Sequence, residues 1–221
     1  MRSPKILFLS PYPFGKAPSQ RLKFEQYYTL FEDNGFELQT SSFIDDDFWE
    51  IIYKPGFLLQ KIEGTVRGYL RRIKDLWRIR QFDIVYIHLW VTPLGPPIFE
   101  WLVKKLAKKI VYDIDDMIYL NNTQKRFIDR IKGRNKPIAL MRCADAVIVC
   151  SPFLEKFAKQ YNQAVTTILA SYNTAATAPK THDAKSLTTI GWTGTHSTLK
   201  YLSIVAPALQ ELSRMRNVEF L

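Results

Sequence analysis

Short, almost uniformly apolar segments alternate with longer segments of helical periodicity along most of this chain. The expected strands are rich in Ile, Val, Leu, Phe and Tyr, which is typical of a parallel sheet covered on both faces. They span residues 5–9, 36–40, 84–88, 110–113, 146–149 and 165–169, and the helical segments between them span 19–33, 57–79, 96–107, 124–143 and 151–161. This order predicts a doubly wound, Rossmann-like α/β sheet.

After residue 169 the pattern lapses and a second unit begins. Residues 171–186 are small and polar, which is linker composition. A strand over 187–191, a helix from about 198 to 215 that Pro207 should kink, and a further strand start follow. Two strands and one helix bury too little surface for an independent core. We therefore expect a first domain over 1–170, a linker over 171–186, and over 187–221 a truncated second Rossmann-like domain.

The charge of the chain is unevenly distributed. The net charge is +10 over 221 residues, yet residues 54–142 alone carry 19 basic and 8 acidic residues. Such a basic block suits an acidic partner, which could be nucleic acid, a phosphate-bearing substrate or an anionic membrane. No nucleic-acid-binding module is present and the aromatic residues lie in apolar runs, so nucleic acid is not an expected partner.

The segment 57–80 carries seven of these basic residues and only two acidic ones. Its periodicity predicts an amphipathic helix whose apolar stripe packs on the sheet while its basic face meets anionic lipid; a solvated basic face without a partner is the alternative. The expected membrane-facing residues are Lys61, Arg67, Arg71, Arg72, Lys74 and Arg78.

Ligands of open parallel sheets bind beyond the carboxyl ends of the strands. After the first strand, Gly15 permits close backbone approach, Lys16 and Arg21 add positive charge, and Ser19 precedes a helix whose N–H groups are free. This combination suits a phosphate, although it matches no nucleotide-binding motif and also fits a plain rigid turn.

Polar residues also follow the third and fourth strands. His88 can hydrogen-bond a sugar hydroxyl or steady developing charge, or it can be purely structural. The carboxylates of Asp113, Asp115 and Asp116 repel one another and need a cation or hydroxyl donors. Although residues 113–115 spell Asp-x-Asp, so do residues 45–47, and such matches arise by chance, so no metal is expected.

The segment 190–198 of the second unit combines two glycines with four hydroxyl residues at a strand-to-helix junction. Such a junction can cradle an anion, and a capping turn without a ligand is the alternative.

Taken together, five stretches resemble one family. They are KILFLSPYPFGKAPSQR, PLGPPIFEWL, KIVYDIDDMIY, ADAVIVCSPFLEKFAKQY and IGWTGTHSTLKYL. In this order they resemble the N-terminal half of the retaining GT-B glycosyltransferases called family 4 or group 1. The resemblance implies two Rossmann-like domains, with the acceptor on the first and the nucleotide-sugar on the second.

The resemblance also implies roles for particular residues. Transfer from a UDP- or GDP-sugar to a glycan or lipid-linked acceptor would proceed with retention and without a metal or other cofactor. His88, Asp115 and Asp116 would be catalytic. The donor would meet Gly15, Gly191, Trp192, Thr193, Gly194 and Thr195, and the acceptor or a phosphate would meet Lys16, Ser19 and Arg21.

Three departures from the family pattern favour an alternative. The chain ends before the family's glutamate pair, Leu89 and Trp90 replace charged residues, and Tyr172-Asn173 replaces the usual Ile-Asp. The alternative is an inactive, truncated remnant that binds acceptor or anionic membrane; a GT-B epimerase has little support from the residues.

The expected location is the cytoplasm, and membrane association, if there is any, is expected to be peripheral, at the inner face of the cell membrane. The N-terminal apolar run is too short for a signal peptide or a membrane span. Cys143 and Cys150 lack metal-binding spacing and are expected to be buried thiols of a reducing compartment.

Overall fold

The computed structural model describes residues 2–118, 133, 135–174, 178, 188–194, 198–214 and 218–220. The chain divides into two compact units, Met1–Asn173 and Thr174–Leu221.

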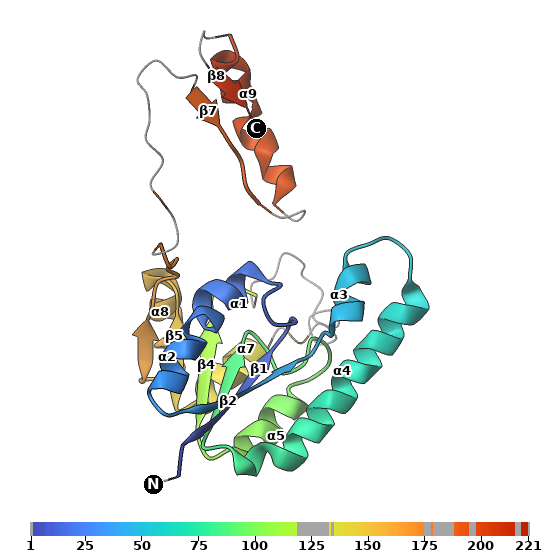
Figure 1. The fold of residues 1–221 in the computed structure, drawn as a ribbon, viewed down its shortest axis with the longest axis vertical. Coiled ribbons are helices and arrows are strands. Elements are labelled where there is room, and N and C mark those ends of the chain that lie inside the picture. Colours follow the sequence, from blue (N-terminus) through green and yellow to red (C-terminus); the bar gives the residue numbers. More distant parts are fainter. Residues whose placement is uncertain are drawn as a thin grey trace. The chain divides into compact units, whose positions relative to one another are not determined.

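The first unit is built on a six-stranded sheet in which all strands are parallel (Figure 1). The strand order is β2-β1-β3-β4-β5-β6. The strands are β1 (Lys5–Ser10), β2 (Glu37–Ser42), β3 (Ile84–His88), β4 (Ile110–Ile114), β5 (Ala146–Val149) and β6 (Val165–Thr167). The predicted Rossmann-like α/β fold is confirmed, and all six strands were predicted, with ends displaced by at most two residues.

The described helices of this unit are α1 (Pro18–Lys23), η1 (Glu25–Tyr27), α2 (Tyr28–Asp33), α3 (Asp46–Ile52), α4 (Leu58–Arg78), η2 (Ile79–Gln81), α5 (Ile98–Leu106), α7 (Lys136–Cys143) and α8 (Pro152–Ala158). The start of α8 follows the sequence signal, because the Ser151 side chain accepts a hydrogen bond from the Leu154 N–H. The helix predicted over 19–33 is instead three short pieces. Of the helix predicted over 124–143, residues 136–143 form α7, and most of 124–135 lies outside the described residues.

Helix α3 was not predicted. Asp45 caps it by accepting a hydrogen bond from the Phe48 N–H, and Asp46 and Asp47 lie in its first turn. Acidic residues at a helix N-terminus interact favourably with the helix dipole. The second Asp-x-Asp match is therefore the beginning of a helix.

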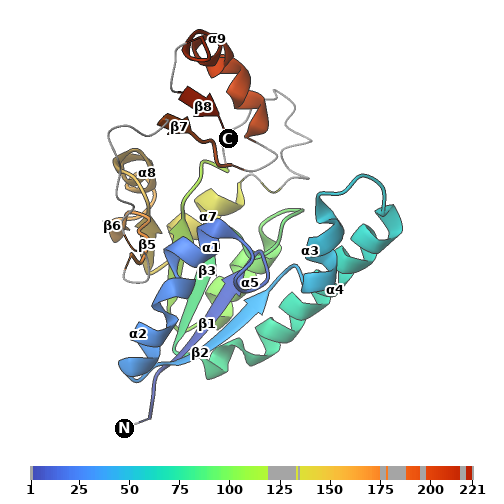
Figure 2. The same ribbon diagram turned by 45° about the horizontal axis from the view of Figure 1, so that its top comes forward.

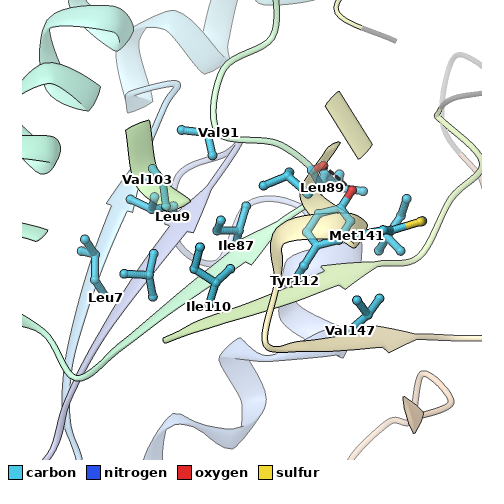
Figure 3. Close-up of a cluster of buried hydrophobic side chains, with 14 of the residues drawn as sticks. Leu7, Leu9, Ile87, Leu89, Val91, Val103, Ile110, Tyr112, Met141 and Val147 are labelled. Atoms are coloured by element: carbon cyan, nitrogen blue, oxygen red, sulfur yellow. Dashed lines mark hydrogen bonds between the residues drawn. The ribbon is translucent and has the colours of Figure 1, made fainter. Parts of the chain in front are cut away.

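Alternating residues of each strand face opposite sides of the sheet, so the core has two parts. Leu7, Leu9, Ile87 and Tyr112 belong to the larger cluster, which α5, α7 and α8 cover (Figure 3). Phe8 and Tyr86, on the other face, pack against Phe24 and the α2 side chains. Figures 1 and 2 show α1 and α2 on one side of the sheet and α4 and α5 on the other.

Helix α4 packs with the face opposite to the predicted one. Its buried positions are Gly64, Gly68, Arg72 and Asp75. A Cβ atom on Gly68 would lie 2.6 Å from the ring and 2.8 Å from the carbonyl oxygen of Phe43. The absence of a side chain at this position lets the helix backbone approach the chain after β2 closely. The prediction that the apolar stripe of α4 packs on the sheet is therefore wrong.

The Arg72 guanidinium, 1% exposed, anchors α4 to the carboxyl ends of the strands. Its Nε donates to the Val91 carbonyl (2.8 Å), its Nη2 to the Ser10 carbonyl (2.8 Å), and its Nη1 to the Ser41 carbonyl (3.0 Å) and to Asp75 (3.1 Å). Burial lowers the pKa of Arg72 to about 10, and Asp75 opposes this shift. The side chain therefore remains charged at neutral pH, with a partner at each nitrogen.

The second unit contains two short parallel strands, β7 (Thr188–Ile190) and β8 (Val218–Phe220). Between them lie η3 (Leu199–Tyr201) and α9 (Leu202–Leu212), which continues through Pro207.

Candidate functional site

The strand order places a topological switch point between β1 and β3. The chain moves from β1 outward to β2, and then crosses back to β3 on the other side of β1. Connections leave adjacent strands in opposite directions at such a point, and ligands of open parallel sheets bind there, beyond the carboxyl ends of the strands. The residues there are Ser10, which ends β1, and His88, which ends β3.

His88 and Asp113 are directly paired across β3 and β4, so their side chains lie on the same face. The His88 Nδ1 is 2.8 Å from the Asp113 Oδ2, and both side chains are fully buried. The other carboxylate oxygen of Asp113 lies 3.0 Å from the Lys23 Nζ, which comes from α1. Three ionisable side chains from three elements thus form a buried chain from Lys23 through Asp113 to His88.

The remaining imidazole nitrogen of His88, Nε2, is buried and has no hydrogen-bond partner within the described part of the chain. A carboxylate that is ion-paired to a lysine accepts hydrogen bonds, so Nδ1 is the donor to Asp113. In the neutral ring Nε2 then carries the free lone pair. An atom of this kind can accept a hydrogen bond from a ligand hydroxyl or take its proton.

The loop after β1 is held in place by Gln20 and Glu25. Gln20 accepts from the Tyr12 N–H (2.8 Å) and donates to the Tyr12 carbonyl (3.0 Å) and to Glu25 (3.0 Å). Glu25 also accepts from the Gly15 N–H at 2.9 Å. Burial raises the pKa of Glu25, and Gln20, Gly15, Arg21 and His88 oppose this shift. The loop is therefore a fixed wall of the site.

The residues of this loop that were predicted to bind a phosphate differ in their contacts. Gly15 has a φ of +75°, as the turn requires, but its N–H is occupied by Glu25. Ala17 is the N-cap and Pro18 the first residue of α1, so Ser19 lies inside the helix and does not cap it. Lys16 lies 3.7 Å from Glu50, and Arg21 is exposed. The expected arrangement of free N–H groups at a cap serine is thus absent from this loop.

Asp115 and Asp116 follow the end of β4 and differ in burial. Asp115 is half-buried; burial and the Asp113 carboxylate raise its pKa, whereas His88 and Lys23 lower it. Asp116 is exposed and accepts a hydrogen bond from the Met117 N–H. Among the described residues, no group of three or more His, Cys, Asp or Glu side chains is arranged to hold a metal ion.

Leu89, which follows His88, has a positive φ of 62° although it is not glycine. Its N–H donates to the Asp113 carbonyl (2.9 Å), and its carbonyl accepts from the Tyr112 hydroxyl (2.8 Å; Figure 3). Its side chain belongs to the core, so an apolar residue at this position serves packing. The turn ends β3 directly after the imidazole.

The donor-binding residues predicted in the second unit follow β7. Gly191, Trp192, Thr193 and Gly194 are exposed, with 43% of Trp192 accessible. Thr195 lies outside the described residues.

Sequence reasoning missed Lys23, Gln20 and Glu25 as parts of the site. The signal for Lys23 was indirect, because a buried aspartate at a strand end requires a cationic partner, and no comparable signal pointed to Gln20 or Glu25. The helix that follows the switch-point loop was the nearest source of one.

The fold and site define a Rossmann-like α/β protein with a buried His–Asp–Lys chain at its switch point. No protein-family model matches the chain, and no curated protein matches it.

Proposed function

We propose that this chain is the acceptor-side portion of a retaining GT-B glycosyltransferase that transfers a sugar from a UDP- or GDP-sugar to a glycan or lipid-linked acceptor. The observation that carries the proposal is the unpartnered Nε2 of His88 at the switch point of the sheet. The order of the sequence stretches that resemble the family supports the same proposal.

In the proposed reaction His88 contacts a hydroxyl of the transferred sugar or of the acceptor. Asp113 holds the ring through Nδ1, and Lys23 balances the charge of Asp113, so both are positioning residues. Asp115 lies on the same edge of the sheet and is close enough to His88 for the two charges to influence each other. It would accept a hydrogen bond from another hydroxyl, as sugar recognition by carboxylates requires.

The residues of the second unit complete the proposal on the donor side. Thr193 and Gly194 lie after β7 in a described, non-helical segment ahead of η3. Backbone N–H groups in such a segment can bind the diphosphate without a metal. In this proposal Asp116, Lys16, Ser19 and Arg21 form the outer rim of the acceptor site.

Saturation-transfer NMR with a panel of UDP- and GDP-sugars and of free glycans tests the proposal on the 221-residue chain. We expect signals from sugar protons, and about tenfold weaker binding after His88→Gln, which corresponds to the loss of about one hydrogen bond. The control is Gln39→Ala, an exposed change on β2 away from the site.

Absence of binding by any sugar of the panel would contradict the proposal, as would equal binding by the His88→Gln variant. Where transfer is observed, proton NMR of the product reports the anomeric configuration. An inverted product would exclude the retaining class.

A further inference from the structure

Helix α4 presents a continuous apolar stripe to solvent. Seven residues form this stripe, and from Leu59 onward they are spaced three or four positions apart. They are Leu58, Leu59, Ile62, Val66, Leu70, Ile73 and Trp77. Leu59 is 79% exposed and Trp77 is 86% exposed. Single exposed apolar residues are ordinary, but seven on one face of a 21-residue helix are not. The helix is amphipathic, and its apolar side faces away from the core of its own unit.

The reversed orientation is fixed by the buried face described above. Gly64 approaches Phe48 so closely that a Cβ atom would lie 2.6 Å from the Phe48 ring, and Gly68 approaches Phe43 in the same way. Arg71 donates to the Ser42 and Phe43 carbonyls (2.7 and 2.8 Å). Rotating the stripe inward would break these contacts and expose the Arg72 cluster. The stripe is therefore held outward by the fold.

Four of the predicted membrane-facing arginines turn to acidic partners of the first unit: Arg67 and Arg71 to Asp45, and Arg72 and Arg78 to Asp75. Arg72 in particular is buried, so its prediction as a membrane-facing residue is wrong. Lys74 stays exposed, and Lys61 is half-buried. The arginines of the basic face predicted to meet lipid are thus paired within the first unit.

Charge decides which partner suits the stripe. On α4, η2 and α5, all of whose residues are described, Glu63 is the only exposed acidic residue. The exposed basic residues on the same elements are Lys74, Arg80, Lys104 and Lys105. A second copy of the chain would bring like charges together around the paired stripes, which costs free energy. An anionic surface instead complements the excess of positive charge.

The aromatic residues favour a lipid surface in particular. Trp77 lies in the last turn of α4, and Trp101 on the adjacent α5 is 60% exposed, with the Lys105 Nζ 5.2 Å from its ring centroid. Tryptophan and lysine together are typical of helices that lie at the boundary between headgroups and acyl chains. None of the described helices is long and apolar enough to cross a bilayer.

We infer that α4 docks on an anionic membrane surface by inserting its apolar stripe, with Lys74, Arg80 and the α5 lysines contacting lipid headgroups. This inference does not depend on the proposed sugar transfer. It differs from the sequence-based expectation in the face that enters the lipid.

Vesicle flotation of the full chain tests the inference with phosphatidylcholine alone and with added phosphatidylglycerol. We expect binding to the anionic vesicles that weakens at high salt, because the headgroup contacts are screened. The variant Leu70→Ser/Trp77→Ser should bind at least about tenfold less at low salt, since two apolar side chains no longer enter the lipid.

The matched control is Leu30→Ser/Phe153→Ser, which removes two similarly exposed apolar residues from α2 and α8. It should bind like the wild type, and circular dichroism checks that both variants are folded. All four positions are exposed, so loss of the fold is not expected.

Three results would overturn the inference. They are no binding of the wild type to anionic vesicles, equal binding by the wild type and Leu70→Ser/Trp77→Ser, and an equal loss in both double variants. Sedimentation velocity without lipid distinguishes the competing occupant. A dimer that Leu70→Ser/Trp77→Ser abolishes, in a chain that does not bind vesicles, would assign the stripe to a second copy.

Discussion

Two of the buried clusters of charged side chains in the first unit, those around Arg72 and His88, differ in how completely their polar atoms are paired. Around Arg72 each guanidinium nitrogen donates to a partner, and Asp75 accepts from Ser41 and Arg78 as well. Around His88 one ring nitrogen has no partner among the described residues. Burying an unpaired polar atom costs free energy in either place. A cluster that pairs every atom serves stability, whereas one that leaves an atom free is suited to binding.

The largest expected effect concerns the fully paired cluster. Arg72→Met should lower the free energy of unfolding by about 3–5 kcal/mol, because Asp75 and three carbonyl groups lose a buried donor. Urea denaturation followed by circular dichroism measures the change. Arg78→Met is the control, since Arg78 contacts the same Asp75 but its side chain is 26% exposed, and its expected loss is about 0–1 kcal/mol. Equal losses in the two variants would show that the buried contacts of Arg72 add no more stability than the partly exposed ion pair of Arg78.

A smaller effect is expected where α4 approaches the chain after β2. Gly68→Ala should lower the free energy of unfolding by about 1–3 kcal/mol, because its Cβ would press on the Phe43 ring and carbonyl oxygen. The exposed change Gln60→Ala on the same helix should be neutral or slightly stabilising. If Gly68→Ala is also stabilising, the close packing that holds the stripe outward is wrong.

The smallest expected effect concerns the incompletely paired cluster. Burial raises the pKa of Asp115 above the ordinary value of 3.8, so the folded state holds this proton more tightly than the unfolded chain does. The ionised side chain therefore costs stability as the pH rises through the folded pKa. Asp115→Asn should raise the free energy of unfolding by about 1 kcal/mol at pH 7.

The pH dependence supplies the control for this prediction. Well below pH 3.8 the carboxyl is protonated in both the folded and the unfolded state, so the gain from Asp115→Asn should disappear. Urea denaturation at a series of pH values measures it. A loss at pH 7 would show that Asp115 is stabilising and would place it with the Arg72 cluster, and a gain that is independent of pH would show that ionisation of Asp115 is not its cause.

Most of the sheet was predictable because its strands are buried on both faces and therefore uniformly apolar. The strand over 84–88 was predicted with its observed bounds. The prediction of a strand over 36–40 differs from the bounds of β2, Glu37–Ser42, because β2 is a polar edge strand with the sequence ELQTSS. Helix α3 was not predicted, because the acidic residues at its beginning were considered only as a match to the Asp-x-Asp metal-binding pattern. Asp45 followed by two acidic residues is also an ordinary helix start.

The orientation of α4 and the composition of the site were harder to predict for a shared reason. Amphipathic periodicity shows that a helix has two faces. It does not show which face packs on the sheet when one face carries leucines and the other carries glycines and an arginine with an acidic partner. His88 could be selected because a strand ends there, and its register with Asp113 followed once the strands were aligned. Lys23 could not be selected in this way, because its ion-pair partner Asp113 lies 90 positions away in the sequence.

The left-handed backbone of Leu89 limits what evolution or design can place after the imidazole. That conformation costs an ordinary residue on the order of 1–2 kcal/mol, whereas glycine and asparagine adopt it more easily. Side-chain size is thus a poor guide to tolerance at this position, because Val or Ile would fill the core and yet oppose the turn. A change that straightened the chain there would lengthen β3 and carry the turn away from His88, even with every site residue unchanged.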